Sequence, residues 1–179
     1  EACHQLGYIT SKFVLDTNSI DSILNDLKNH DFVFIALHGS FGEDGAIQSI
    51  LSKNNIPYNG SDEDSSRNCF NKSVTKEIVM EQGILSPSYY QTSCNTCNDH
   101  FDFSAEKYIV KPNSQGSSVG FNVVNRLEDL NDAIDIALDF DSSVIIEEFI
   151  DGKEITVPIL ENEPLPVIEI EPKSGIYDY

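Results

Sequence analysis

Lys-Pro-Asn-Ser-Gln-Gly-Ser-Ser-Val-Gly, residues 111–120, is the stretch around which the rest of the chain can be read. It lies between two apolar segments, 108–110 and 121–124, that predict strands. Its glycines and serines would let backbone N–H groups and hydroxyls approach an anion closely, and Lys111 adds a mobile positive charge. The stretch is not a Walker A loop, because it lacks the Gly-Lys-Ser/Thr motif and a strand rather than a helix follows it. A phosphate-binding loop and an ordinary hairpin turn both fit this stretch taken alone.

The composition is that of a soluble globular protein: of 179 residues, 40 % are hydrophobic and 23 % are charged. Eleven basic and 30 acidic residues give a formal net charge of −19, so we expect no binding to nucleic acid or to an anionic membrane. No apolar run is long enough to span a membrane, and residues 1–5 do not resemble a signal peptide. We therefore expect a cytoplasmic protein in which any anion site must concentrate scarce positive charge.

Four cysteines are too few for a disulfide framework in a chain of this size. Cys94 and Cys97 form a Cys-x-x-Cys pair with His100 close behind, a pattern found in zinc and redox sites. The sequence has no second pair that would complete four ligands. We favour a reduced surface loop over a metal or redox role, and we assign no metal ligand within this sequence.

The first part of the chain alternates helical and extended patterns, which is typical of an α/β domain with a parallel sheet. The continuous apolar run 32–37 predicts a buried parallel strand. The other predicted elements are a helix ending at Gly7, a strand at 10–15, a helix with Ile20 and Leu27 on one face and Asn18 or Ser19 as N-cap, a helix at 46–53, a strand at 56–58 and a turn at 59–61.

A glycine-rich loop, His-Gly-Ser-Phe-Gly-Glu-Asp-Gly at 38–45, follows the apolar run directly. Ligands collect at the carboxyl ends of strands in open α/β sheets, so this loop is a candidate ligand site. Its imidazole, His38, and its carboxylates, Glu43 and Asp44, are the groups that would act there. The simpler alternative is a loop histidine bonded to the backbone, which we favour from this motif alone.

The second part of the chain predicts a helix at 63–82 that carries Lys72 and Lys76 and ends at Gly83. Lys72 by itself is more simply read as a solvated helix lysine. Residues 89–103 are polar and predict no clear element. Beyond the 111–120 loop, the pattern predicts an amphipathic helix with Leu127, Leu130, Ile134, Ala137 and Leu138 on its apolar face, a buried strand at 144–146, and closing strands at 155–160 and 165–171.

The segment Glu-Glu-Phe-Ile-Asp-Gly-Lys-Glu, residues 147–154, has the residue types of a nucleotide hinge. Adenine needs an extended backbone that pairs with its ring edge and an apolar wall beside it, and a later carboxylate can hold the ribose hydroxyls. Glu147, Phe149, Ile150 and Glu154 supply these types in that order. Taken alone, any acidic strand end would look similar.

Taken together, these motifs resemble the D-alanine–D-alanine ligases of the ATP-grasp superfamily, in the family's order and over nearly the whole chain. Each motif is modest by itself, but the set in register is specific. The matching motifs are His-Gly-x-Phe-Gly-Glu-Asp-Gly (38–45), Ile-Pro-Tyr-x-Gly-Ser (56–61), Asn-Lys (71–72), Lys-Pro-x-x-x-Gly-Ser-Ser-Val-Gly (111–120), Glu-Glu-Phe-Ile-x-Gly-Lys-Glu (147–154), Leu-Pro-x-x-Glu-Ile (165–170) and Tyr-Asp-Tyr (177–179).

The resemblance implies an α/β (α+β) fold with three parts. Residues 1–61 would form a partial pre-ATP-grasp parallel-sheet domain. Residues 62–147 would form the small ATP-grasp subdomain, and 148–179 would begin the large C-terminal subdomain.

The resemblance also implies a reaction. ATP phosphorylates the carboxylate of one D-alanine, and the amine of a second D-alanine attacks this acyl phosphate to give D-alanyl-D-alanine for peptidoglycan precursors. Catalysis of this kind depends on positioning and on cancelling phosphate charge. The implied partners are ATP with Mg²⁺ or Mn²⁺, whose ligands would lie outside this sequence, and D-alanine, with the full-length protein as a homodimer.

Roles for individual residues follow only from the resemblance. His38 and Glu43 would serve the side of the site that binds the first D-alanine, and Ser117 would belong both to the catalytic residues and to a lid over the phosphates. The expected ATP contacts, by side chain or backbone, are Lys72, Lys111, Ser117, Ser118, Glu147, Glu148, Phe149, Ile150 and Glu154.

Parts of the family pattern have no counterpart in residues 1–179, including an amino-terminal glycine-serine loop, a catalytic arginine and the magnesium ligands. We therefore expect an internal fragment of the enzyme. A non-catalytic nucleotide-binding module is the alternative of a different class. A ligase that joins D-alanine to D-lactate or D-serine is the close variant, although Tyr177-Asp-Tyr179 leans towards D-alanine.

This expectation predicts that the 179-residue chain alone does not turn over. A coupled assay of ADP release with ATP, Mg²⁺ and D-alanine should stay at background. Release well above that of a heat-treated sample would contradict the fragment interpretation.

Overall fold

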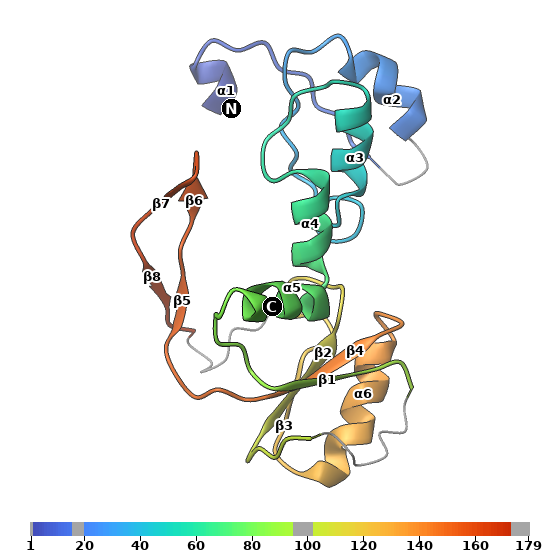
Figure 1. The fold of residues 1–179 in the computed structure, drawn as a ribbon. Helices are drawn as coiled ribbons and strands as arrows, with labels where there is room; N and C mark the ends of the chain where they lie inside the picture. The colour runs from blue at the N-terminus through green and yellow to red at the C-terminus, as the bar shows by residue number, and fades with distance from the viewer. Residues whose placement is uncertain (1, 16–19, 95–101, 173–179) are drawn as a thin grey trace. The chain divides into compact units, whose positions relative to one another are not determined.

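The computed structural model describes residues 2–15, 20–94 and 102–172, and the chain forms two compact units (Figure 1). The first unit is Glu1–Ser66 and the second is Arg67–Tyr179. Helices and strands occur together, as expected for the α/β (α+β) class. In the described parts of the chain, no helix is both long enough and apolar enough to cross a membrane.

The first unit is built on helices whose apolar faces meet in one core. Ile20 and Leu27 of α2 pack with Ile47 and Leu51 of α3, and Ile56 completes the buried cluster. The spacing of three to four residues that predicted these helices places their apolar side chains on one face, so both helices are confirmed. The helices of this part of the chain are α1 (Ala2–Gln5), α2 (Ile20–Leu27), α3 (Ala46–Lys53) and the beginning of α4 (Glu63–Phe70). The N-cap proposed at Asn18 or Ser19 lies outside the described residues.

Among the described residues of the first unit, the predicted parallel strands are reduced to one bridge, between Val33 and Tyr58. The run 32–37 is not buried on both faces: Phe32 is 51 % exposed and Phe34 71 % exposed, whereas Val33 and the alternate residues pack against the core. The ladder stops early because the side chain of Asn59 takes the place of a neighbouring backbone. Its Oδ1 accepts from the Ile35 amide at 2.5 Å, and its Nδ2 donates to the Ile35 carbonyl at 3.4 Å.

The strand predicted at 10–15 is also wrong. A strand needs a hydrogen-bonded neighbour, and within the described residues no segment pairs with this one. Phe13 and Leu15 still pack against the core of the first unit. The apolar pattern of this segment therefore reflects contact with the core and not hydrogen bonding to a neighbouring strand.

The single helix predicted at 63–82 is two helices, α4 and α5 (Lys72–Glu81). Asn71 interrupts them with an extended backbone, φ −90° and ψ 107°, and its side chain accepts from the Val74 amide as the N-cap of α5. The predicted end of the helix is confirmed at Gly83, whose φ is +75°. The Gly83 and Ile84 amides donate back to the carbonyls of Met80 and Val79.

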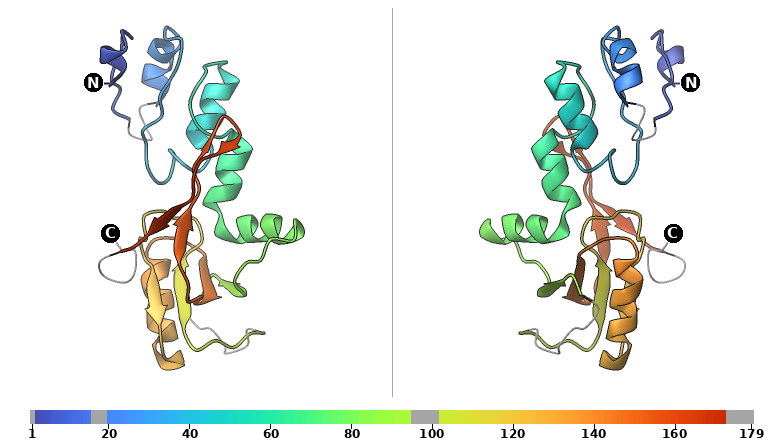
Figure 2. Two further views of the ribbon diagram at one scale, coloured as in Figure 1. Left: turned by 90° about the vertical axis from the view of Figure 1, so that its left-hand side faces the viewer. Right: turned by 90° about the vertical axis from the view of Figure 1, so that its right-hand side faces the viewer.

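The second unit contains a four-stranded antiparallel sheet in the order β1-β4-β2-β3, with α6 along one face (Figures 1 and 2). Its core joins Val110, Ile146 and Val124 of the strands to Leu130 and Ile134 of the helix side. These elements are β1 (Tyr89–Thr92), β2 (Tyr108–Pro112), β3 (Asn122–Val124), a 3₁₀ turn (Leu127–Asp129), α6 (Leu130–Leu138) and β4 (Val144–Glu148).

Strand β1 falls in the segment for which the sequence predicts no element. It lies at the edge of the sheet, and its middle residues Tyr90 and Gln91 are exposed, so it lacks the apolar alternation of a half-buried strand. Strand β4 beside it, buried from Val144 to Glu147, supplies the hydrogen-bonding partner. Pairing rather than side-chain pattern therefore specifies β1.

Two short antiparallel pairs end the described chain, β5 with β8 and β6 with β7. They are β5 (Glu154–Thr156), β6 (Ile159–Leu160), β7 (Glu163–Pro164) and β8 (Ile168–Ile170). The predicted strand at 155–160 is divided into β5 and β6, the predicted strand at 165–171 contains β8, and β7 lies before it. Glu161 and Asn162 make the turn between β6 and β7 with positive φ angles of 52° and 68°.

Gly120 closes the 111–120 loop where a side chain has no room. Its φ is +68°, and a Cβ placed on it would lie 2.8 Å from Pro112 Cγ and 2.9 Å from Phe140 Cδ2. We predict that Gly120→Ala destabilises the second unit by about 1–3 kcal/mol, through both backbone strain and overpacking. Gly152→Ala is the matched control, because a Cβ there meets no atom within 4 Å. Urea unfolding should separate the two variants, and equal midpoints would contradict the prediction.

Candidate functional site

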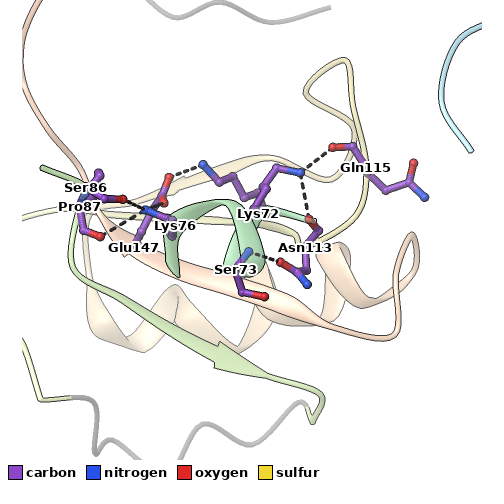
Figure 3. Close-up of polar contacts among 9 residues, drawn as sticks. Lys72, Ser73, Lys76, Ser86, Pro87, Asn113, Gln115 and Glu147 are labelled. Atoms are coloured by element: carbon purple, nitrogen blue, oxygen red, sulfur yellow. Dashed lines mark hydrogen bonds and ion pairs between the residues drawn. The ribbon is translucent and has the colours of Figure 1, made fainter. Parts of the chain in front are cut away.

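The candidate site lies within the second unit, where α5 meets strands β2 and β4. Lys72 begins α5 and Lys76 follows one turn later, which places both side chains on the same face of the helix. Lys111 lies in β2, two residues after Ile109, which is the register partner of Glu147 in β4. Residues two apart in a strand point to the same face, so Lys111 lies diagonally across from Glu147. Figure 3 shows Lys76 beside Glu147, Ser86 and Pro87, and Lys72 directed towards Asn113 and Gln115.

Glu147 is the buried centre of this arrangement, with only 6 % of its surface exposed. Its Oε2 forms an ion pair with Lys76 Nζ at 2.8 Å, and its Oε1 pairs with Lys111 Nζ. Burial by itself would raise the pKa of Glu147, but the charges and hydrogen bonds of Lys111 and Lys76 outweigh burial, so the pKa is lowered. The carboxylate is therefore ionised in a place from which most water is excluded.

Lys72 faces the loop rather than Glu147. Its Nζ donates to the carbonyls of Gln115 at 2.6 Å and Asn113 at 3.4 Å (Figure 3). Burial, together with repulsion from Lys111, lowers the pKa of Lys72 to about 8, although Asp141 and Glu147 partly oppose this. An ammonium whose charge is disfavoured in this way is stabilised by any anion that binds beside it.

Asn113 ties the start of the loop to the start of α5. It is 3 % exposed; its Oδ1 accepts from the Ser73 amide at 2.9 Å, and its Nδ2 donates to Asn71 Oδ1 at 3.1 Å. Its carbonyl accepts from the Lys72 amide at 3.0 Å. Lys72 and the loop are thus held in one polar network.

The loop itself is anchored at its base and exposed at its tip. The Ser114 amide donates to Asp141 at 2.6 Å, and the Gln115 side chain donates to the Phe140 carbonyl at 2.9 Å. Ser117 and Ser118 both have positive φ, 53° and 55°, and Ser117 is exposed. The loop joins the antiparallel strands β2 and β3, so it is a hairpin connection as well as a candidate anion site.

The predicted hinge is partly engaged in bonds of the chain itself. Glu148 Oε1 accepts from the Ser88 amide at 2.7 Å, which commits that carboxylate to the edge of the sheet. The Phe149 amide donates to the Lys107 carbonyl, and Lys107 Nζ lies 5.5 Å from the centre of the Phe149 ring. Ile150, 60 % exposed, makes no hydrogen bond to another described residue, and Glu154 is exposed in β5.

The His38 loop belongs to the first unit and is held mainly by its own side chains. His38 Nδ1 lies 3.7 Å from Glu43 Oε1, with the histidine side chain 87 % exposed. Glu43 Oε2 accepts from the Gly39 amide at 2.7 Å, and Asp44 accepts from the amides of Phe41 and Ala46. The carboxylates of this loop therefore support its conformation.

The described residues contain no group of three or more His, Cys, Asp or Glu side chains that could hold a metal ion. Cys94 is exposed, and its amide donates to Thr92 Oγ1 at 3.2 Å. Cys97 and His100 lie outside the described residues, as do residues 177–179.

Two important residues were not assigned to the site from the sequence. The sequence marks Lys76 only as a helix lysine, although its spacing from Lys72 indicates a shared helix face. Asn113 looked like one more small polar loop residue, and no sequence signal marks it as buried. Their roles arise from contacts with β4 and with the cap of α5.

The buried charges predict a large stability effect at Glu147. Glu147→Ala would leave Lys76 and Lys111 partly buried without their shared counter-charge, so we expect a loss of about 3–5 kcal/mol. Glu106→Ala, which removes an exposed carboxylate in the same unit, should change stability by less than about 0.5 kcal/mol. Urea unfolding at pH 7 measures both, and a Glu147 variant as stable as the control would contradict the ion-pair geometry.

Two family profiles match the chain: one described as D-ala D-ala ligase N-terminus at residues 10–61, and one described as D-ala D-ala ligase C-terminus at 77–179. The chain is similar to the D-alanine–D-alanine ligase of Aquifex aeolicus (strain VF5), with 40 % identity over all of this chain and 61 % of the relative. It is 37 % identical to that of Methylacidiphilum infernorum (isolate V4), over all of this chain and 56 % of the relative. The chain thus spans little more than half the length of these relatives.

Solved structures agree with the sequence matches. The D-alanine–D-alanine ligase of Bacillus anthracis complexed with ATP superposes with a TM-score of 0.76 at 33 % identity, over 88 % of this chain and 54 % of that one. The VanG D-Ala:D-Ser ligase of Enterococcus faecalis gives a TM-score of 0.70 at 33 % identity, over 83 % of this chain and 46 % of that one. The chain therefore belongs to the D-alanine–D-alanine ligase family and has the ATP-grasp fold of that family in the part it covers.

Proposed function

We propose that the chain supplies the nucleotide-binding part of an ATP-dependent ligase that joins two D-alanines to D-alanyl-D-alanine for peptidoglycan precursor synthesis. The observation that carries this proposal is the pair formed by Lys72 and Lys111. Burial lowers the pKa of Lys72 to about 8, and the positive charge of the nearby Lys111 contributes to this shift. In a chain with a net charge of −19, such concentrated positive charge fits a polyphosphate.

The donor inventory of the two lysines supports this role. An ammonium has three N–H donors. Lys72 donates two hydrogen bonds to loop carbonyls, and Lys111 donates one to Glu147. Each of these side chains keeps a donor for phosphate oxygens, and the loop tip with the exposed Ser117 and the half-buried Ser118 would cover them.

The base and ribose would lie along the hinge. Ile150 offers a backbone with no hydrogen bond to another described residue, Phe149 offers an apolar wall, and Glu154 is exposed as a carboxylate for ribose hydroxyls. Glu147 would accept from an amino group of the base. Glu148 would act through its backbone, because its carboxylate already accepts from the Ser88 amide.

The reaction we propose has two steps. The terminal phosphoryl group of ATP passes to the carboxylate of one D-alanine, with Lys72 and Lys111 neutralising the phosphate charge. The amine of the second D-alanine then attacks the carbonyl carbon, and inorganic phosphate leaves. Mg²⁺ or Mn²⁺, held by ligands outside this sequence, would add positive charge to offset that of the phosphates. His38 and Glu43 would serve the first D-alanine.

Further parts of the proposal concern the whole protein. We propose a cytoplasmic homodimer of which residues 1–179 are a part, with the domain divisions 1–61, 62–147 and 148–179. The share of the curated relatives that the chain spans, 56 % and 61 %, supports a longer parent. No nucleic-acid or membrane partner is proposed.

A second candidate function is a ligase that takes D-serine as its second substrate. It is supported by the VanG D-Ala:D-Ser ligase, whose 33 % identity equals that of the Bacillus anthracis ligase bound to ATP. An assay of the complete protein with D-alanine, D-serine and D-lactate as competing second substrates distinguishes the candidates. A non-catalytic module would release no phosphate with any of them.

The phosphate role predicts unequal effects of two lysine substitutions in the complete protein. Lys72→Met should weaken ATP binding by about tenfold or more, because it removes a charged donor worth about 1.5–3 kcal/mol. Lys28→Met, at an exposed position in the first unit, should leave the affinity unchanged within about twofold. Calorimetric titration with ATP measures both, and equal affinities of the two variants would remove the proposed phosphate role.

A further inference from the structure

Lys76 differs from the other two lysines in that three acceptors of the protein surround its ammonium group. Its Nζ contacts Glu147 Oε2 at 2.8 Å, Ser86 Oγ at 3.0 Å and the Pro87 carbonyl at 3.2 Å (Figure 3). An ammonium carries three N–H groups, and here two of them donate hydrogen bonds while the charge is paired with Glu147. Its side chain is also only 10 % exposed. Lys76 is therefore engaged within the protein rather than directed towards a phosphate.

Lys76 shares the carboxylate of Glu147 with Lys111. Each carboxylate oxygen of Glu147 has its own lysine, Lys76 on Oε2 and Lys111 on Oε1. The other ionisable groups near Glu147 are Lys72, which also interacts with it electrostatically, and Tyr89, its register partner in β1. With three cations around it, Glu147 stays ionised despite its burial.

The ionised state matters because a carboxylate only accepts hydrogen bonds, whereas a neutral carboxyl group also donates one. An ionised Glu147 can pair with the 6-amino group of adenine. It would place two lone pairs against each other if the purine carried a 6-oxo group instead. A protonated Glu147 could donate to that oxygen, and the distinction between the two bases would weaken.

We infer that Lys76 is a positioning residue that holds Glu147 as an oriented carboxylate, so that the nucleotide site selects 6-aminopurines over 6-oxopurines. This inference rests on the proposed function, since it requires that a nucleotide binds along β4. Lys76 acts through Glu147 and does not touch the ligand. Ser86 and Pro87, in the segment before β1, accept the other hydrogen bonds of Lys76.

The test uses the complete protein and measures dissociation constants for ATP and for inosine triphosphate, which carries the 6-oxo group. In the wild-type protein the preference for ATP should be the same at pH 5.5 and pH 7.5, within about twofold. In Lys76→Met, Glu147 loses one of its two ion-pair partners and its pKa rises. The preference should then fall severalfold at pH 5.5 and return at pH 7.5, because burial is opposed by one ion-pair partner fewer and the neutral carboxyl group becomes populated at the lower pH.

Lys28→Met is the matched control and should behave as the wild type does. Lys76→Arg keeps a buried cation and should restore a preference that does not depend on pH. If Lys76→Met weakens both nucleotides equally at both pH values, Lys76 has only a structural role and the inference is wrong. The inference is equally wrong if Lys76→Met matches Lys28→Met while the wild type binds ATP. A wild-type protein that binds no ATP overturns the proposed function, and the inference with it.

Folding of each variant is checked by circular dichroism. If Lys76→Met does not fold, carbon-13 NMR of the Glu147 side chain in the wild-type protein replaces it. A carboxylate signal at pH 5.5 supports the inference. A protonated carboxyl group at that pH overturns it.

Discussion

A carboxylate buried between two lysines sets the geometry of the second unit. Moving Glu147 out of water is unfavourable unless its charge is met closely, and Lys76 and Lys111 meet one oxygen each. These residues come from α5, β2 and β4, so the same contacts that neutralise the charge also join the helix to the sheet. The pairing of β2 with β4 brings Lys111 to Glu147, and the cap at Asn71 aims α5 so that Lys76 reaches it.

Positive charge is scarce in this protein, and the lysines of the second unit have two different roles: one is internal pairing and the other is a candidate role in anion binding. Lys76 is surrounded by acceptors of the chain and belongs to the internal structure. Burial and the charge of Lys111 lower the pKa of Lys72 to about 8, which means that its charged form is disfavoured. An anion bound beside Lys72 would stabilise that charged form. Asn113 connects the two tasks, because its side chain joins the cap of α5 and its carbonyl receives Lys72. The ordering of Lys72 thus depends on the same helix that carries Lys76.

Much of the fold could be predicted from the sequence where burial follows a simple period. Helices α2, α3 and α6 have apolar residues every three to four positions, and β2 and β4 are short apolar runs with turn residues beside them. The wrong predictions of strands and helices share one cause, which is that the local residue pattern does not indicate which segments form hydrogen bonds with each other. The segment 10–15 is apolar but has no neighbour among the described residues, whereas β1 is polar and becomes a strand because β4 lies beside it. The break at Asn71 was missed because asparagine inside a helical stretch does not by itself reveal that its side chain will cap the next helix.

The sequence by itself determined the family, the order of the motifs and the residue types available for binding a nucleotide: Lys72, Lys111, the 111–120 loop and the 147–154 segment. These are properties of spacing along the chain, which folding does not alter. Only the tertiary structure decided which of these residues meet. It placed Glu147 against two lysines rather than at an exposed strand end, committed Glu148 to the Ser88 amide, and made Lys76 an internal partner. Ion pairs and pKa shifts depend on distance and burial, and residues as far apart in the chain as Lys76 and Glu147 acquire both only when the sheet and α5 pack together.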